Sequence, residues 1–300
     1  MASEIGWELY RSFLGVLKEG SLSGAARELG VAQPTIGRHI AALEKALNLA
    51  LFTRSPTGLR PTDSALALES HAAAMASTAA ALERAAASQG EGVRGVVRIT
   101  ASEVIGVEVL PPIIGDLHAR YPDLKVELVL TSRVQDLLRR EADIAVRMTP
   151  PRQESLVARR IGAVELGLYA RQEYLERRGT PRNSSELAQH TIIGFDQMTA
   201  FMRSFSKSSP VFSRDLFSLR TDNDLAQLAL IRAGAGIGLC QVPVAKRSEG
   251  LLRILPRQVS LPLETWITMH EDLRARPGCR VAFEALRVGL TEHVAAGPAR

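Results

Sequence analysis

The stretch of sequence that decides the fold is GSLSGAARELGVAQPTIGRHIAALEKALNLALFTRSPTGLRPT, residues 20–62. Its first part predicts a short helix, because Ser21 or Ser23 can cap the N-terminus of a helix and Gly30 can end it. Pro34 suits the first turn of the next helix, where a missing N–H costs nothing. That helix has one apolar face, formed by Ile36, Ile40, Leu43 and Leu47. Two helices joined by a tight turn containing Gly are the pattern of a helix-turn-helix.

A further helix precedes this pair. Tyr10, Phe13, Leu14 and Leu17 recur at helical spacing, and Gly20 closes the pattern. The outer face of the helix that begins near Pro34 is small and polar, so this helix can enter a DNA major groove. Gln33 and Thr35 can reach base edges, and Arg38 can contact a guanine edge or a phosphate. A solvated helix face is the alternative for any one of these residues alone, but the turn spacing favours DNA contact.

Residues 51–62 predict a hairpin, or wing, of two short extended arms around a Pro/Gly turn. Arg54 and Arg60 flank its tip beside small hydroxyl residues, which suits contact with phosphate or the minor groove. The candidate DNA contacts on the helices and the wing are together Ser23, Gln33, Pro34, Thr35, Arg38, His39, Arg54, Thr57 and Arg60.

The same block resembles the N-terminal signature of the LysR-type transcriptional regulators. The resemblance runs without a gap and includes Ala25-Ala26, Gln33-Pro34, Arg38, Leu43-Glu44, Leu51-Phe52, Arg54 and Thr62. Two residues depart from the family pattern: Ala32 replaces a capping Ser, and Gly37 replaces a common Ser. The missing cap costs about 1 kcal/mol, and a Gly inside a helix costs about 1 kcal/mol relative to Ala. The resemblance implies a winged helix-turn-helix DNA-binding domain over residues 1–62.

A long linker helix is predicted over residues 63–90. There is no Pro or Gly from Asp63 to Gln89, and twelve of the 23 residues from 65 to 87 are alanine. Small and apolar residues recur at heptad spacing, which favours pairing with a second helix over a plain surface helix: Leu68, Ala72, Met75, Ala79 and Leu82. The resulting homodimer presents two recognition helices to an interrupted palindrome, as the family resemblance also implies.

Residues 91–300 alternate short Val/Ile/Leu-rich runs with helical stretches, which is an α/β pattern. Strands are predicted at residues 96–100, 125–130, 143–146, 165–169, 191–195, 217–221, 236–240 and 265–270. Helices are predicted at residues 107–120, 134–140, 225–233 and 280–294.

The segments GVVRITAS, LPPIIGDLHARYPDL, DLLRREADIAVRM and ALIRAGAGIGLC resemble the effector-binding portion of the same family, which is similar to two-lobed periplasmic binding proteins. The resemblance implies a first lobe of about residues 92–163 plus 267–300, a second lobe of about residues 164–266, and a ligand cleft between them. The expected fold is therefore an α/β multidomain protein with an N-terminal winged helix-turn-helix, a long linker helix and a C-terminal two-lobed α/β effector domain.

Polar residues follow the predicted strands, where ligands bind in α/β proteins. The candidate effector contacts are Ser102, Thr131, Ser132, Arg147, Phe195 and Thr221. Hydroxyl groups and an arginine suit a small polar or carboxylate metabolite, whereas Glu103 argues against a strongly anionic one. Ordinary turn and cap chemistry is the alternative for these residues, because Ser and Thr end strands and start helices everywhere.

Charge and cysteine content say less than the motifs. The net charge is +5 with a pI near 9.5, but residues 1–61 carry seven basic and five acidic side chains, a net of only +2. Cys240 and Cys279 make no disulfide framework, so we expect two reduced, packed thiols, with a redox pair as the alternative. No segment approaches the roughly 20 apolar residues of a membrane helix, and no secretory signal is present, so we expect a cytoplasmic protein.

Rival functions fit the sequence less well. An enzyme is disfavoured because no nucleophile elbow, paired catalytic carboxylates, zinc-ligand spacing or phosphate loop is present, and we expect no cofactor or metal. The glycines at 234, 236 and 238 follow a predicted helix and precede a strand, the reverse of a dinucleotide fingerprint. A solute-binding module has no need of the first ninety residues, and an architectural DNA-binding protein has no need of the α/β lobes. The predicted function is sequence-specific, effector-modulated transcription regulation by a homodimer that assembles into a tetramer.

Overall fold

The computed structural model describes residues 5–56, 58–87, 92–131, 141–151, 156–197, 203 and 213–297. These residues form two compact units, one of residues 1–86 and one that contains most of the chain from Ala87 onward. Thr57, Ser132 and the helix predicted at residues 134–140 lie outside the described residues.

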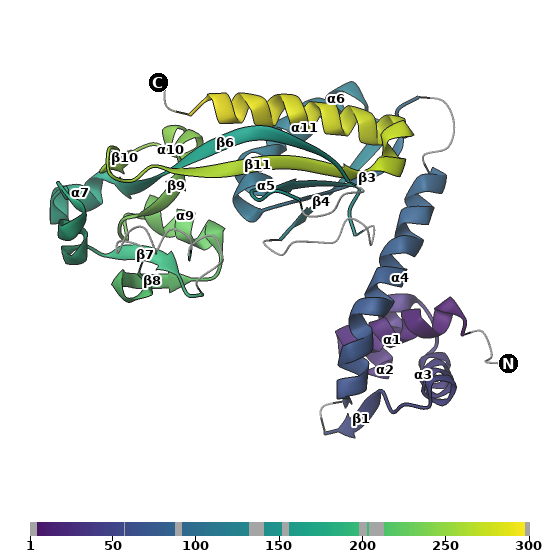
Figure 1. Ribbon diagram of the computed structural model, residues 1–300. Coiled ribbons are helices and arrows are strands. Elements are labelled where there is room, and N and C mark those ends of the chain that lie inside the picture. The colour runs from purple at the N-terminus through teal and green to yellow at the C-terminus, as the bar shows by residue number, and fades with distance from the viewer. Residues whose placement is uncertain are drawn as a thin grey trace. The chain divides into compact units, whose positions relative to one another are not determined.

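The first unit contains the predicted three helices and hairpin (Figure 1). Its elements are α1 (Trp7–Glu19), α2 (Leu22–Leu29), α3 (Gln33–Leu47), β1 (Phe52–Ser55), β2 (Gly58–Pro61) and α4 (Asp63–Ala87). Gly20 ends α1 in the left-handed conformation, with φ of 65°. The Ser21 hydroxyl accepts a hydrogen bond from the Gly24 N–H at 3.1 Å, so Ser21 and not Ser23 caps α2. The core of this unit includes the fully buried Phe13, Ile36 and Leu43.

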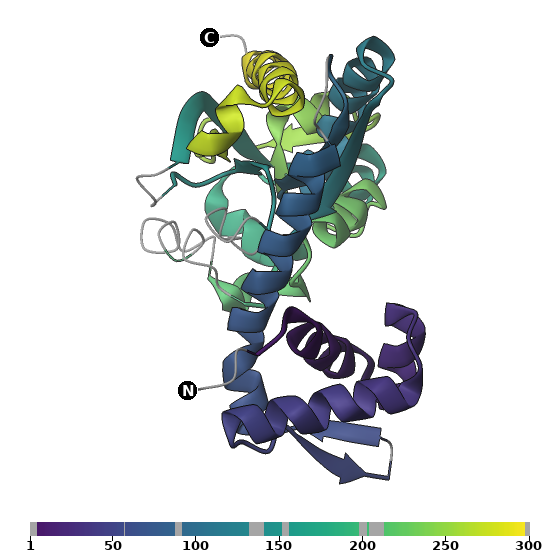
Figure 2. The same ribbon diagram turned by 90° about the vertical axis from the view of Figure 1, so that its right-hand side faces the viewer.

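The wing is attached to the helices at both ends. The Leu59 N–H donates to the Gly20 carbonyl at 2.8 Å, and a Cβ on Gly58 would lie 2.6 Å from that same oxygen. Only glycine therefore fits at residue 58, where φ is 133°. At the other end, Glu44 Oε1 of α3 accepts a hydrogen bond from the Leu51 N–H at 2.7 Å. Figure 2 shows β1 and β2 as adjacent arrows.

The first turns of α4 pack against the core of their own unit. Thr62 caps this helix, since its hydroxyl accepts a hydrogen bond from the Ala65 N–H at 3.2 Å. Ala72 is buried, and Leu68 is partly buried, in the cluster that contains Phe13. Leu68 and Ala72 of the predicted seam therefore also pack against their own unit, because heptad spacing alone does not tell which partner covers a residue.

Gly37 of α3 offers a test of local helix stability. It lies inside the helix, and a Cβ there would contact only Leu22 Cδ1, at an ordinary 3.7 Å. We expect Gly37→Ala to raise the free energy of unfolding of the first unit by about 0.5–1 kcal/mol, because Ala loses less backbone entropy. Gly58→Ala is the matched control, expected to destabilise because its Cβ meets the Gly20 carbonyl. Calorimetry of both variants measures the difference, and an unfolding temperature unchanged or lowered by Gly37→Ala would contradict the expectation.

The second unit is built on a seven-stranded sheet with the order β10-β6-β11-β5-β3-β4, and β9 also pairs with β6. The strands are β3 (Gly95–Ala101), β4 (Leu124–Leu130), β5 (Ile144–Arg147), β6 (Leu156–Arg171), β9 (Gly238–Gln241), β10 (Leu251–Ile254) and β11 (Leu261–His270). Two more strands, β7 (Ile192–Phe195) and β8 (Phe217–Thr221), form a separate parallel pair. The long strands β6 and β11 lie antiparallel, side by side, along the unit (Figure 1).

The second unit has separate hydrophobic cores at its two ends. At one end, α6 (Leu110–Arg120) and α11 (Pro277–Ala295) cover β3, β4 and β5, and the buried residues include Ile99, Leu110 and Ile144. At the other end, α7 (Gln172–Arg178), α9 (Asp224–Arg232) and α10 (Val242–Lys246) pack with β7 to β10 in two further clusters. The strand β6 contributes Ile161 to the first core and Leu168 to the second. Short 3-10 helices lie at Ser184–Gln189, Arg214–Leu216 and Glu271–Ala275.

Most predicted strands and helices of this unit are confirmed, with shifts at their ends. The strand predicted at residues 236–240 begins at Gly238, and β10, α7, α10 and the first half of β6 were not predicted. The single helix predicted at residues 107–120 is wrong. It divides at Val109 into α5 (Glu103–Glu108) and α6, because Pro111 and Pro112 lack the N–H groups that a continuous helix needs.

The glycines before β9 form the predicted helix-to-strand turn. Gly234 has a φ of 69°, and a Cβ on Gly236 would lie 2.3 Å from the Thr191 carbonyl. This close approach allows Ile237 to pair with Ile192 of β7. The glycine run therefore serves backbone packing.

The two cysteines lie in different cores. Cys240 is buried in a cluster with α9 and α10, and Cys279 is buried in the cluster beneath α11. Burial raises the pKa of the Cys240 thiol to about 12, so this thiol stays protonated at neutral pH. Both cysteines are thus free and packed, as expected, and they are not joined by a disulfide in this structure.

Candidate DNA-binding surface and effector cleft

The exposed side of α3 carries most of the predicted DNA contacts. Gln33 and Pro34 are the first two residues of the helix and are exposed, and Arg38 is exposed one turn further on. Thr35 is half-buried, and Ser23 is exposed on α2. The opposite face of α3 is buried at Ile36, Ile40 and Leu43, so the core fixes which side of α3 is free to contact DNA.

His39 lies less openly on α3 than the sequence predicts. Its side chain is half-buried, and its Nδ1 lies 2.8 Å from the hydroxyl oxygen of Ser12 on α1. Ser12 is itself buried, at 3% exposure. Sequence periodicity gives no signal for this polar contact between α1 and α3, because its partners are 27 residues apart.

The two wing arginines are exposed but lie on opposite faces of the hairpin. Arg54 pairs across the hairpin with Leu59, whereas Arg60 pairs with Thr53. Directly opposed residues share a face and neighbours along a strand alternate, so Arg54 and Arg60 cannot approach one phosphate from the same face. Thr57, the third wing candidate, lies outside the described residues.

The structure brings three of the predicted effector contacts together in the first lobe. Ser102, Thr131 and Arg147 stand at the carboxyl ends of the adjacent parallel strands β3, β4 and β5. Ser102 and Thr131 are half-buried, and the Thr131 N–H donates to the Ala101 carbonyl at 3.0 Å. Ser132 lies outside the part of the chain that the structure describes.

Arg147 is a cation held at the strand ends. Its Nη2 donates to the Thr100 hydroxyl at 2.8 Å, and its Nη1 donates to the Val146 carbonyl at 3.0 Å. Burial lowers the pKa of Arg147 to about 10, so the guanidinium is still charged at neutral pH. Among the described residues both partners are neutral oxygens, which leaves a positive charge suited to an anionic group.

Phe195 and Thr221, the second-lobe candidates, end β7 and β8 directly opposite each other. Phe195 packs against the neighbouring buried cluster. The Thr221 hydroxyl accepts a hydrogen bond from the Asn223 N–H at 3.1 Å, in the turn that leads into α9. Thr221 therefore takes part in a turn, which by itself does not decide between turn chemistry and ligand contact.

The two lobes meet where α5 packs against α9. Val104 of α5 packs against the buried cluster that contains α9 and α10. Burial and the negative charge of Glu103 raise the pKa of Asp224, the first residue of α9. Two acidic groups, Glu103 and Asp224, therefore lie close together at this junction.

Comparison with known proteins identifies both parts of the chain. Residues 7–66 match the bacterial regulatory helix-turn-helix proteins of the lysR family, and residues 90–290 match the LysR substrate binding domain. The chain belongs to the LysR family of transcriptional regulators. It is therefore a DNA-binding regulator with an effector-binding domain, in a family of transcription regulators rather than enzymes.

Two relatives show how similar this LysR-type regulator is to other HTH-type regulators. It is 29% identical over 240 residues to an HTH-type transcriptional regulator of Xanthomonas campestris pv. campestris. The aligned region covers 78% of this chain and 70% of the relative. It is 31% identical over 279 residues to the HTH-type transcriptional regulator ShiR of Corynebacterium glutamicum, which covers 87% of this chain and 88% of ShiR.

Solved structures show the same fold. The LysR family regulator CbnR has a TM-score of 0.68 and 20% identity, with 95% of this chain and 99% of CbnR covered. The Vibrio cholerae virulence activator AphB has a TM-score of 0.61 and 21% identity, with 95% of this chain and 99% of AphB covered. The structure of CbnR bound to its target DNA has a TM-score of 0.67 and 20% identity, with 97% of this chain and 99% of CbnR covered. The expected arrangement of helix-turn-helix, long helix and α/β domain is confirmed.

The described part of the regulator shows two negative findings. None of its helices combines the length and the apolar character needed to cross a membrane. Among the same residues, no group of three His, Cys, Asp or Glu side chains is placed to hold a metal ion.

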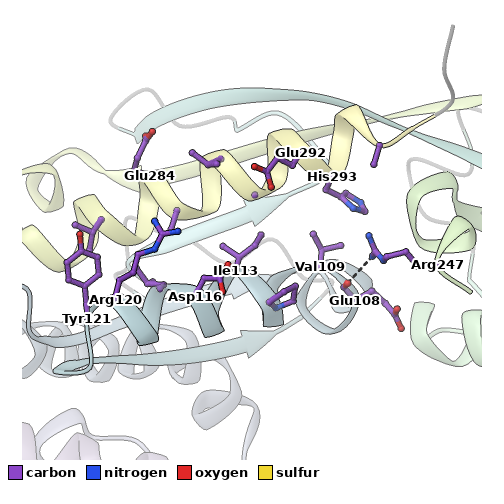
Figure 3. Close-up of a pocket in the computed structure, with 17 residues that line it drawn as sticks. Glu108, Val109, Ile113, Asp116, Arg120, Tyr121, Arg247, Glu284, Glu292 and His293 are labelled. Carbon is purple, nitrogen blue, oxygen red and sulfur yellow. Dashed lines mark hydrogen bonds between the residues drawn. The ribbon is translucent and has the colours of Figure 1, made fainter.

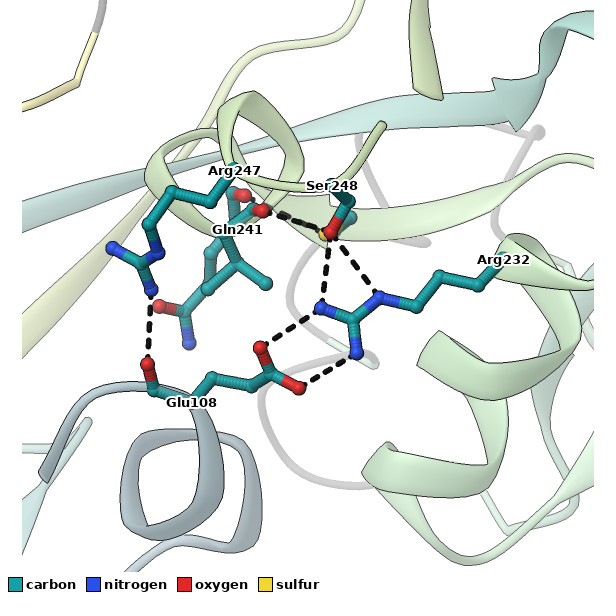
Figure 4. Close-up of polar contacts among 7 residues, drawn as sticks. Glu108, Arg232, Gln241, Arg247 and Ser248 are labelled. Atoms are coloured by element: carbon teal, nitrogen blue, oxygen red, sulfur yellow. Dashed lines mark hydrogen bonds and ion pairs between the residues drawn. The ribbon is translucent and has the colours of Figure 1, made fainter. Parts of the chain in front are cut away.

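An ion pair that sequence reasoning missed connects the two lobes of the regulator (Figure 4). Both guanidinium Nη atoms of Arg232, at the end of α9, donate to the carboxylate of Glu108, at the end of α5, at 2.7 and 2.8 Å. Arg232 also donates to the Ser248 hydroxyl, at 3.0 Å from Nη2, and Arg247 donates to the Glu108 carbonyl at 3.0 Å. The hydrogen bond from Arg232 lowers the pKa of Glu108. The partners are 124 residues apart, so no local pattern predicts the pair.

A groove of about 600 Å³ runs between α6 and α11 (Figure 3). Val109 and Ile113 lie in its middle, with the acidic Asp116 and Glu292 beside them. Arg120 and Tyr121 line one end, and Glu108, Arg247 and His293 line the other. The groove is separate from the strand ends that carry the predicted effector contacts.

His293 connects α11 to the second lobe. It is only 5% exposed, and its Nε2 lies 3.1 Å from Gln241 Oε1 at the end of β9. Nearby, Lys246 Nζ donates to the Ala296 and Gly297 carbonyls at 3.1 and 2.8 Å, at the end of α11. Burial, with a smaller contribution from the charge of Arg247, lowers the pKa of His293 to about 4.

The buried His293 predicts acid destabilisation. The pKa of His293 is about 4 in the folded protein and 6.5 for an exposed histidine, so on acidification the unfolded chain takes up the proton first. The contribution of neutral His293 to the free energy of unfolding is fully present above pH 6.5 and is lost as the pH falls from 6.5 toward 4. Between pH 7.5 and 5.5, we expect wild type to lose about 1 kcal/mol more free energy of unfolding than His293→Gln. Urea denaturation at both pH values measures this difference, and the same pH dependence in both proteins would contradict it.

Proposed function

We propose that the regulator binds double-stranded promoter DNA as a homodimer, with α3 in the major groove and the wing against the DNA backbone. The observation that carries this assignment is the exposed side of α3, which presents Gln33 and Arg38 while its other face is buried in the core. Base contacts are assigned to Gln33, Thr35 and Arg38. The remaining proposed contacts are Ser23, Pro34, His39, Arg54, Thr57 and Arg60.

The proposed dimer contact is the heptad seam of α4, formed by Leu68, Ala72, Met75, Ala79 and Leu82. Met75 is 42% exposed, Leu82 is 72% exposed, and Ala79 between them is half-buried. These three residues keep the heptad spacing of the predicted seam, so a second copy of α4 could cover them. Pairs of dimers are proposed to form a tetramer, in which the spacing of the DNA-binding domains depends on the effector domains.

The proposed domain boundaries are residues 1–62 for DNA binding, 63–90 for the linker helix and 91–300 for the effector domain. Support comes from the separate cores, since Ile161 packs in one and Leu168 in the other. The chain passes back from the second core to the first along β11, because Leu261 packs in the second core and Ile267 in the first. These two crossing points support lobes of about 92–163 plus 267–300 and about 164–266.

The proposed effector is a small polar or carboxylate metabolite bound where the lobes meet. Ser102, Thr131 and Arg147 share one edge of the sheet, and Arg147 supplies the positive charge. Ser132, Phe195 and Thr221 complete the proposed set, with Phe195 and Thr221 opposite each other on the second lobe. Effector binding changes DNA binding only if the effector binds one arrangement of the lobes more tightly than another.

DNA selection tests the first part of this function. The full chain is used to enrich duplexes from a random-sequence pool, and the enriched sequences are read. We expect an interrupted palindrome whose half-sites are about 10 bp or a multiple of it apart, because a twofold dimer presents two recognition helices. Failure to enrich any common sequence would refute sequence-specific binding.

Calorimetry tests the cleft. Small hydroxylated and carboxylated compounds that raise the unfolding temperature of the full chain are titrated into wild type, Ser102→Ala and Thr131→Ala. Loss of one hydrogen bond should weaken binding by about threefold to tenfold. Thr291→Ala is the matched control, because its hydroxyl bonds the Arg287 carbonyl on α11. Equal binding by all four proteins would place the effector elsewhere.

A further inference from the structure

The contact between Ser12 and His39 can fix the orientation of the histidine ring. Ser12 is 3% exposed on α1, and its hydroxyl oxygen lies 2.8 Å from His39 Nδ1 on α3. Buried hydroxyl groups in proteins are hydrogen-bonded, and this hydroxyl has the imidazole as its partner. The contact fixes which ring nitrogen faces α1 and therefore which nitrogen faces away from it.

The two ring nitrogens have different chemistry. When the Ser12 hydroxyl donates to Nδ1, the neutral imidazole carries its proton on Nε2, and Nε2 becomes a donor. Phosphate oxygens and the N7 and O6 atoms of guanine are acceptors, so they can receive this hydrogen bond. In the opposite tautomer Nε2 presents a lone pair, which repels both kinds of acceptor.

His39 stands at a suitable place on α3. It follows Thr35 by four residues, so both lie on one face of the helix, and it is adjacent to the exposed Arg38. Its Nδ1 contacts Ser12, and its Nε2 makes no hydrogen bond with the described residues.

We propose that Ser12 is a positioning residue for DNA binding. Its hydroxyl donates to Nδ1 of His39 and so presents the Nε2–H of His39 to an acceptor on the DNA. The proposal rests on the proposed function, in which this side of α3 contacts DNA. Ser12 itself does not touch DNA and acts through His39.

A double-mutant cycle tests the coupling. Affinity for a duplex enriched by the wild-type chain is measured for Ser12→Ala, His39→Ala and the double variant. We expect each single variant to bind about threefold to tenfold more weakly, since one hydrogen bond is lost. The double variant should bind no more weakly than His39→Ala, because Ser12 acts only through that ring. A Ser12→Ala effect that is absent, or that persists undiminished in the His39→Ala background, overturns the proposal.

A second measurement reads the tautomer directly. Long-range ¹H–¹⁵N spectra of the full chain labelled at histidine, with the His39 signals assigned by loss in His39→Ala, report which nitrogen carries the proton. We expect the Nε2–H form as the single neutral tautomer in wild type, a mixture of the Nε2–H and Nδ1–H forms in Ser12→Ala, and a return to the single form in Ser12→Thr, which restores a hydroxyl. The Nδ1–H form in wild type overturns the proposal even if Ser12→Ala fails to fold.

One further arm separates this proposal from the function on which it rests. If Arg38→Ala binds the duplex as tightly as wild type, the assignment of α3 fails, and the failure does not come from Ser12. Salt titrations identify the acceptor: a slope reduced by about one in His39→Ala indicates a phosphate, and an unchanged slope with altered base preference indicates a base edge. Either result supports the proposal.

Discussion

Arg38→Ala is expected to weaken binding of the regulator to its enriched duplex by about tenfold to a hundredfold, because a bidentate arginine contact with guanine carries about 1–3 kcal/mol. Arg38 is exposed on α3 and lies one turn from the helix N-terminus. Its loss should also relax selectivity at one base pair of each half-site. Fluorescence anisotropy at one fixed salt concentration measures the affinity, since protein–DNA affinities depend steeply on salt.

Arg54→Ala separates a backbone contact from a base contact. We expect a smaller loss of affinity that is similar for all sequences, and a salt slope reduced by about one. Arg11→Ala on α1 is the matched control, because Arg11 is exposed in the same unit but lies outside the proposed DNA contacts. Unchanged affinity in both the Arg38 and the Arg54 variants would refute the assignment of recognition helix and wing.

The first unit could be predicted almost completely because its signals are local. Gly20 and Gly30 end their helices in the left-handed conformation, and Ser21 caps the helix between them, as residue type alone suggests. The contact of Ser12 with His39 could not be predicted, because helical periodicity places side chains on faces without saying which polar groups meet across a core.

The α4 seam shows the same limit for apolar residues. A heptad pattern predicts that a face is covered, and in this structure Ala72 is buried and Leu68 is partly buried against the helices of their own unit. Met75 and Leu82 of the same pattern are exposed and are the residues most open to a second chain.

In the effector domain, local patterns predicted buried strands and missed those held by distant pairing. The strands β3 and β5 are mostly buried, whereas β4 lies at the sheet edge and alternates charged and apolar residues. The polar residues after these three strands led to the three clustered candidates. The first half of β6 carries the exposed Arg159 and Arg160 and is held by pairing with β11, more than a hundred residues later. Its sequence alone does not resemble a buried strand.

The pair Glu108–Arg232 supplies the second large expected effect. Arg232→Ala removes two charged hydrogen bonds from Glu108, whose side chain is only 19% exposed. Because a hydrogen bond to a charged group contributes about 1.5–3 kcal/mol, we expect the free energy of unfolding of the second unit to fall by about 1–3 kcal/mol. Hydrogen exchange of the full chain should become faster in α5 and α9, where the two lobes meet.

The matched control is Arg287→Ala, because Arg287 pairs with Glu284 on the same helix and this ion pair does not connect the two lobes. That variant should lose about 0.5 kcal/mol or less, with no change of exchange in α5 or α9. A further measurement asks whether the Glu108–Arg232 pair affects the response to the effector or only stabilises the fold. If Glu108–Arg232 holds the lobes in one arrangement, Arg232→Ala changes the ratio of DNA affinities measured with and without a compound that binds the cleft. An unchanged ratio together with unchanged exchange in α5 would show that the lobes are held by other contacts.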